Sequence, residues 1–217
     1  MKKIIRLVWL IAFLPAMAFS QEKIEAPVWN VGEKWTFTGE GSIEVVRVDP
    51  NGFILNFSKR NCMVETQGCS AIFFEKLTRN RINAVEGEKR KKYVMGLSKI
   101  LDFPLSTGKQ WKAAYSSTEV SRQSGHNYYY DYSELFKILG LEDIQVRAGK
   151  FRAIRIEYRR VVTSSSWTFA TIGEEIKHQY WYSPEAKYFV KCQYDKDWKK
   201  SNKDIFDWEL TSFQVKK

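Results

Sequence analysis

The stretch Arg152-Ala153-Ile154-Arg155-Ile156-Glu157-Tyr158-Arg159-Arg160-Val161-Val162 decides the fold class of this chain. Apolar side chains stand at even positions, namely Ile154, Ile156, Tyr158 and Val162. Charged side chains stand between them, namely Arg155, Glu157 and Arg159. Successive side chains of a β-strand point to opposite faces, so this pattern predicts a strand with one buried face and one solvent-exposed face.

The same alternation recurs on both sides of this stretch. Residues 176–182 and 188–194 alternate in the same way, and the proline-containing segment 183–187 between them predicts a β-hairpin. A last strand is expected at Ile205–Val215. Turn residues such as those of 49–52 separate further runs towards the N-terminus. Strands are expected there at 34–37, 42–48, 53–57, 71–77, 111–116 and 128–139.

These runs predict an all-β protein with about ten antiparallel strands. Periodicity alone leaves Lys91–Leu101 and Ser133–Leu141 ambiguous between strand and helix. One or two short helices in these segments would leave the fold class unchanged.

The first 20 residues have the three parts of a secretory signal peptide: a basic start, an apolar stretch from Leu7 to Phe19, and small residues before Gln21. The apolar stretch is shorter than the roughly 20 residues of a membrane-spanning helix, and Pro15 interrupts it. We therefore expect cleavage of residues 1–20, a single domain over residues 21–217, and a periplasmic or secreted protein that does not span a membrane. No cysteine stands near the end of the apolar stretch, so no lipid anchor is expected.

The mature protein is expected to be basic. The full chain carries a net charge of +10, and removal of residues 1–20 takes away three basic groups and no acidic group, which leaves +7. Such a charge attracts anionic envelope partners, and it also keeps a protein soluble without any partner. Export, scattered charges and the lack of a recognition motif argue against nucleic acid as a partner.

Three cysteines remain to be explained. In an oxidising compartment, Cys62 and Cys69 are predicted to form a disulfide that closes a small loop containing Gly68. Cys192 is expected to be a buried, small apolar residue in a strand, with a rearranged pairing or a reactive thiol as the alternatives.

Candidate catalytic and metal-binding residues are scarce. His126 lies in a polar segment, and His178 lies in a predicted strand, where a hydrogen-bonded or rim histidine is expected. Two isolated histidines lack the clustering of a zinc site, and the sequence contains no nucleophile elbow and no phosphate-binding glycine loop. We therefore expect a protein that is not an enzyme and holds no metal and no cofactor.

The aromatic segment Tyr128-Tyr129-Tyr130-Asp131-Tyr132 is the most unusual local feature. Alternation would send Tyr128, Tyr130 and Tyr132 to one face of a strand. Ordinary sheet packing explains such tyrosines. The alternative is a wall of amphipathic rings for a sugar or lipid chain, with three tryptophans as neighbours: Trp181, Trp198 and Trp208.

A short motif occurs twice, as Gly32-Glu33-Lys34-Trp35 and as Gly108-Lys109-Gln110-Trp111, and Gly149-Lys150-Phe151 is similar to it. A glycine turn that delivers an aromatic side chain onto a sheet face explains all three. Two origins would explain this repetition: two related halves of the chain, or the same local structure arising independently in two places.

Four phrases resemble exported bacterial proteins of a domain-of-unknown-function family. They are Val31–Phe37, Phe103–Trp111, Ala148–Ile154 and Tyr180–Lys191. This family is similar to the half-barrel carriers that move lipoproteins across the periplasm. The resemblance implies a single, strongly curved antiparallel sheet, a half-barrel or open barrel, with an apolar concave face, and it implies no catalytic residues.

The sequence therefore favours a non-enzymatic binding or carrier protein. Its concave aromatic face would hold a hydrophobic, amphipathic or anionic envelope ligand through Tyr128, Tyr130, Tyr132, Trp181 and Trp208. The alternative is an assembly module that binds an envelope protein through a sheet edge and the Cys62–Cys69 loop.

Overall fold

A computed structural model gives the fold of the chain. The structure describes residues 22–39, 41–49, 52–57, 72–75, 92–97, 101–120, 127–166, 169–196 and 207–216. The predicted signal peptide, the predicted Cys62–Cys69 disulfide, His126 and Trp198 lie outside these residues.

Within these described residues, eleven strands form one antiparallel sheet. Their bounds are β1 (Lys34–Phe37), β2 (Gly41–Asp49), β3 (Gly52–Phe57), β4 (Ile72–Glu75), β5 (Lys92–Leu97), β6 (Gln110–Val120), β7 (Asn127–Val146), β8 (Gly149–Ser166), β9 (Phe169–Ser183), β10 (Tyr188–Tyr194) and β11 (Trp208–Gln214). Their order across the sheet is β4-β3-β2-β1-β11-β10-β9-β8-β7-β6-β5. The first strand therefore pairs with the last one in the interior of the sheet.

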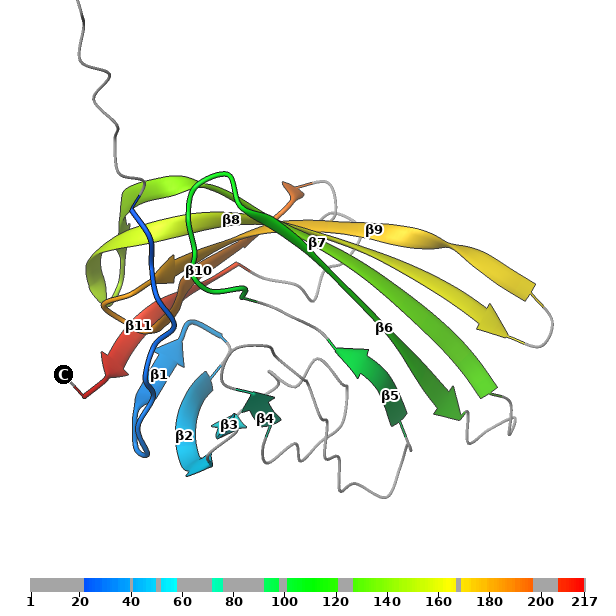
Figure 1. Ribbon diagram of the computed structural model, residues 1–217, viewed down its shortest axis with the longest axis horizontal. Coiled ribbons are helices and arrows are strands. Elements are labelled where there is room, and N and C mark those ends of the chain that lie inside the picture. Colours follow the sequence, from blue (N-terminus) through cyan, green and yellow to red (C-terminus); the bar gives the residue numbers. More distant parts are fainter. Residues whose placement is uncertain are drawn as a thin grey trace, which may run out of the picture.

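The sheet is strongly curved and is not closed into a barrel (Figure 1). The long strands β6 to β9 arch over the region of β1 to β4, and the two edge strands, β4 and β5, lie on the same side of the arch. This architecture confirms the expected all-β class and the open, curved sheet.

The two segments that were ambiguous between helix and strand are strands where they are described. Ser133–Leu141 lies inside β7, and residues 92–97 form β5. β7 also continues beyond the predicted end at residue 139, because pairing with β8 extends it to Val146. A register shift between Ile138 and Gly140 accommodates that glycine.

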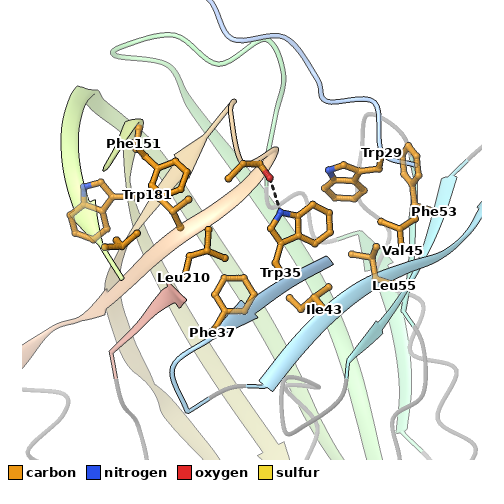
Figure 2. Packing of buried hydrophobic residues seen from close by; sticks show 14 residues of the cluster. Trp29, Trp35, Phe37, Ile43, Val45, Phe53, Leu55, Phe151, Trp181 and Leu210 are labelled. Carbon is orange, nitrogen blue, oxygen red and sulfur yellow. Dashed lines mark hydrogen bonds between the residues drawn. The ribbon is translucent and has the colours of Figure 1, made fainter. Parts of the chain in front are cut away.

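The core consists of two clusters of buried side chains. The first surrounds Trp35, whose Nε1 donates a hydrogen bond to the backbone oxygen of Ala186 at 2.6 Å (Figure 2). The second surrounds Phe136, whose ring stacks on Trp111 with centroids 5.1 Å apart. Tyr188 and Trp208 pack against both clusters, so the two form a continuous apolar interior.

Both copies of the glycine–tryptophan motif enter the sheet in the same way. Gly32 N–H donates to the oxygen of Val45 at 2.8 Å, and Gly108 N–H donates to the oxygen of Ile138 at 3.0 Å. Their φ values of 87° and 81° lie in the region that favours glycine. Trp35 and Trp111 are both buried. The interpretation of a glycine turn that delivers an aromatic side chain to the sheet is confirmed.

Candidate functional site

The register of β6 to β11 places a group of tyrosines and polar side chains on one side of the sheet, here called the tyrosine face. Paired residues of neighbouring antiparallel strands share a face. The pairs Tyr115–Tyr132, Glu134–Arg160, Tyr158–His178, His178–Tyr194, Tyr180–Cys192 and Cys192–Trp208 define the tyrosine face, and Tyr130 joins it by alternation along β7.

Of the predicted ligand-binding residues, Tyr130, Tyr132 and Trp208 lie on this face. Tyr132 stacks on Tyr115 with centroids 4.5 Å apart, and the ring of Tyr130 lies 6.4 Å from that of Tyr132. The ring centroids of Trp208 and Tyr180 lie 6.3 Å apart. Tyr128 lies further along β7, opposite Ser166 in the register.

Trp181 does not lie with the tyrosines, and this part of the predicted arrangement is corrected. It points to the opposite face, where its Nε1 donates to Glu142 Oε1 at 2.6 Å and the Nζ of Lys191 lies 4.7 Å from its ring. The sequence already contained the reason: Tyr180 and Tyr182 share a face by alternation, so the residue between them faces the other way.

A buried carboxylate on the tyrosine face was not anticipated from the sequence. Glu134 is 5% exposed, and its Oε1 accepts hydrogen bonds from the hydroxyl groups of Tyr158 at 2.7 Å and Tyr115 at 3.3 Å. Burial and the charge of Glu134 raise the pKa of Tyr158, so its hydroxyl stays protonated and donates. A carboxylate at a buried position between Tyr132 and Phe136 was the signal that could have revealed it.

Arg160 lies opposite Glu134, and its guanidinium is 5.8 Å from the ring centroid of Tyr132. Burial opposes its charge, but Tyr158, Tyr115 and Glu134 together raise the pKa of Arg160, so it remains a cation. Its Nε is buried and has no hydrogen-bond partner among the described residues.

His178 is enclosed by aromatic rings. It is 4% exposed, and its ring lies 4.3 Å from Tyr158, 4.6 Å from Tyr180 and 4.8 Å from Tyr194, measured between centroids. Both ring nitrogens lack a hydrogen-bond partner in the part of the chain that is described. Contrary to expectation, it is therefore neither a rim histidine nor a hydrogen-bonded one.

The charge state of His178 follows from its surroundings. Burial, and then the charge of Arg160, lower the pKa of His178 to about 3, so the ring is neutral near pH 7. A neutral imidazole offers one donor and one acceptor. Leaving a buried polar atom unpaired costs about 1–3 kcal/mol, so a ligand that pairs with these nitrogens would gain affinity.

Three further findings concern the described residues. Across the described ranges, no three His, Cys, Asp or Glu side chains converge in the way that metal ligands would. Cys192 is completely buried in β10, as predicted for a small apolar residue in a strand. Within those same ranges, no helix is long and apolar enough to cross a membrane.

Comparison with known proteins identifies the fold. No family model and no curated protein matches the sequence. A crystal structure from Bacteroides fragilis, of a protein described as exported and as having a YmcC-like fold, has a TM-score of 0.50 and 14% identity over 88% of this chain and 99% of that one. The chain has a YmcC-like fold.

The YmcC-like fold is also represented by the hypothetical lipoprotein YmcC of Escherichia coli. That structure has a TM-score of 0.39 and 8% identity to this chain, over 89% of this chain and 90% of the other. The similarity to these proteins concerns the architecture of the sheet.

Proposed function

We propose that this protein is a non-catalytic binding or carrier protein of the bacterial envelope and that its tyrosine face holds an amphipathic ligand. The observation that carries the proposal is His178, buried among three tyrosine rings with both ring nitrogens unpaired among the described residues. The packing of the sheet does not require a polar side chain at position 178, whereas recognition of a ligand with a polar group does.

The order of side chains along the tyrosine face matches an amphipathic molecule. Ile138 and Ile156, which belong to the second core cluster, form an apolar row. Glu134, Arg160 and His178 supply polar groups beyond them, and the rings of Tyr132 and Tyr130 continue along β7. Tyrosine presents an apolar ring and a polar hydroxyl, so these rings suit a chain that ends in a polar group.

The envelope location rests on the sequence and on the fold. Residues 1–20 have the composition of a secretory signal peptide. The two structures with a similar fold are described as an exported protein and as a lipoprotein. A carrier in this compartment would protect the apolar part of its ligand from water.

Native mass spectrometry of the mature protein purified from its own periplasm tests this function. We expect a stoichiometric adduct that organic extraction identifies as a molecule with an acyl or similar apolar chain. A substitution pair on β7 provides the control: Tyr132→Ser should lose most of the adduct, whereas Tyr129→Ser, at a 49% exposed position on the opposite face, should keep it.

An apo mass for the wild type, with no extractable amphiphile, would contradict the proposal. Co-purification of an envelope protein without any small molecule would favour instead the assembly module that uses a sheet edge and the Cys62–Cys69 loop.

A further inference from the structure

Two side chains on neighbouring strands of the tyrosine face hold buried nitrogen atoms without hydrogen-bond partners among the described residues. They are Arg160, through its Nε, and His178, through both ring nitrogens. Arg160 pairs with Ile176 in the register, and His178 lies two residues further along β9. The two side chains are therefore diagonal neighbours on one face, within reach of a single small group.

Arg160 has the properties of an oxyanion receptor. It is half-buried, stays charged, and lies over the ring of Tyr132. A guanidinium group presents a planar fork of N–H donors that matches the oxygen atoms of a carboxylate or a phosphate.

Glu134 is the acidic group that faces Arg160 across β7 and β8. Its Oε1 already accepts hydrogen bonds from Tyr158 and Tyr115. Those bonds orient the tyrosines and spread the charge of Glu134, while the Nε–H of Arg160 still lacks an acceptor among the described residues.

His178 complements Arg160 as a second donor. Because its imidazole is neutral, one ring nitrogen carries a proton that it can donate without a counter-ion. An oxyanion could accept hydrogen bonds from Arg160 Nε and from His178 together. An uncharged head group could accept a hydrogen bond but would bring no negative charge to pair with the guanidinium of Arg160.

We propose that the ligand of the tyrosine face is an acidic amphiphile whose carboxylate or phosphate binds between Arg160 and His178, with its apolar chain along Tyr132 and Tyr130. This inference rests on the proposed function and names the chemical class of its ligand.

Four probes test the ligand class on the wild-type mature protein by isothermal titration: dodecanoate, dodecyl phosphate, the uncharged monododecanoyl glycerol, and inorganic phosphate. We expect the two acidic amphiphiles to bind at least about tenfold more tightly than the uncharged one, because only they pair a negative charge with the guanidinium of Arg160. Inorganic phosphate should bind more weakly than dodecyl phosphate because it lacks the chain.

Two adjacent arginines provide a matched pair of variants. Arg160→Gln should weaken dodecanoate binding by at least about tenfold and leave monododecanoyl glycerol unaffected. Arg159→Gln removes the same charge from the opposite, exposed face, where Arg159 forms an ion pair with Glu157 at 3.0 Å, and it should bind dodecanoate like the wild type.

Histidine NMR on the wild-type protein avoids any effect of substitution on folding. The chain has two histidines, so two imidazole signals are expected, and His126→Gln assigns them. A bound anion stabilises the protonated ring, so dodecyl phosphate, whose phosphate group is still an anion in this acidic range, should raise the pKa of His178 above about 3. The uncharged amphiphile should not raise it.

The outcomes separate this inference from the proposed function. Equal affinity for the charged and uncharged amphiphiles, or dodecanoate binding that survives Arg160→Gln, would overturn the acidic ligand class and leave a carrier of amphiphiles. Failure of all three amphiphiles to bind would overturn both. Equal affinity for inorganic phosphate and dodecyl phosphate would support the oxyanion site but contradict an amphipathic ligand.

Discussion

Glu33 connects three distant parts of the chain through one buried carboxylate. It is 1% exposed, and it accepts hydrogen bonds from Asn30 N at 3.1 Å, Asn30 Nδ2 at 3.2 Å, Lys187 Nζ at 2.8 Å and Lys216 N at 3.0 Å. The segment before β1, the β9–β10 turn and the residues after β11 are therefore held at a single point.

We expect Glu33→Gln to lower the free energy of unfolding by about 3 kcal/mol, because it leaves the largely buried ammonium of Lys187 without its counter-ion. Chemical denaturation of both proteins measures this difference. Glu44→Gln is the control: it removes an exposed ion pair with Lys34 at 3.7 Å and should cost less than about 1 kcal/mol. Equal losses in the two variants would contradict this role of Glu33.

The same carboxylate makes stability depend on pH. Burial tends to raise the pKa of Glu33, but the hydrogen bonds from Lys187, Asn30 and Lys216 outweigh it and hold that pKa below its ordinary value of 4.5. A lowered folded-state pKa gives stability that is present above the unfolded value and is lost as the pH falls through the folded one. The stability advantage of the wild type over Glu33→Gln should stay constant from neutral pH down to about 5 and shrink below 4.5. Unfolding curves across this range test it, and a decline that begins at neutral pH would assign the effect to another group.

Some predictions for single residues agree with the structure and others do not, and each result has a physical reason. Alternation along β7 correctly grouped Tyr130 with Tyr132, and the same rule applied to β9 would have excluded Trp181. Glu134 and Arg160 were not predicted, because their roles come from pairing between β7 and β8 and not from their own spacing in the sequence.

At the level of the element, a glycine at the entry to β6 fixes how that strand begins. Gly108 has a φ of 81°, and a Cβ there would meet no atom within 4 Å, so a substitution is penalised by backbone conformation and not by a clash. Gly108→Ala should therefore cost about 1–2 kcal/mol. Gly140→Ala, in the interior of β7 with the same open space, should be neutral or stabilising by up to about 1 kcal/mol. Thermal unfolding compares them, and equal effects of the two substitutions would refute the conformational explanation.

Most elements could be predicted because an alternating pattern of apolar and polar residues marks a strand with one buried face. The alternation of Ile154, Ile156 and Tyr158 with charged residues survives in the burial pattern of β8. The ends of the strands were harder to predict. β7 and β8 extend as a hairpin of 20 and 18 residues, and pairing with each other supports residues that local patterns do not mark as strand.

On the scale of the whole molecule, the structure predicts one cooperative unit. Tyr188 and Trp208 pack against both core clusters, and β1 hydrogen-bonds to β2 and β11. The ¹⁹F NMR signals of fluorotryptophan at Trp35 and Trp111, one in each cluster, should disappear at the same denaturant concentration. Two separate midpoints would show that the clusters unfold independently.

The order of strands could not be read from the sequence. Alternation shows which face of a strand is buried, but it does not show which strand is its neighbour. The pairing of Lys34 with Gln214 joins residues from opposite ends of the chain, and no local signal encodes such a contact. The curvature was expected only through resemblance to exported proteins.

The pairing of β1 with β11 also determines when folding can be completed. During synthesis, β1 to β4 emerge first, but the neighbour that joins them to β10 emerges only with residues 208–214. Until then the edge of β1 that pairs with β11 is open. A nascent chain of this kind stays incompletely folded until late in translation, which is compatible with the export predicted from residues 1–20, because an exported chain crosses the membrane before it folds.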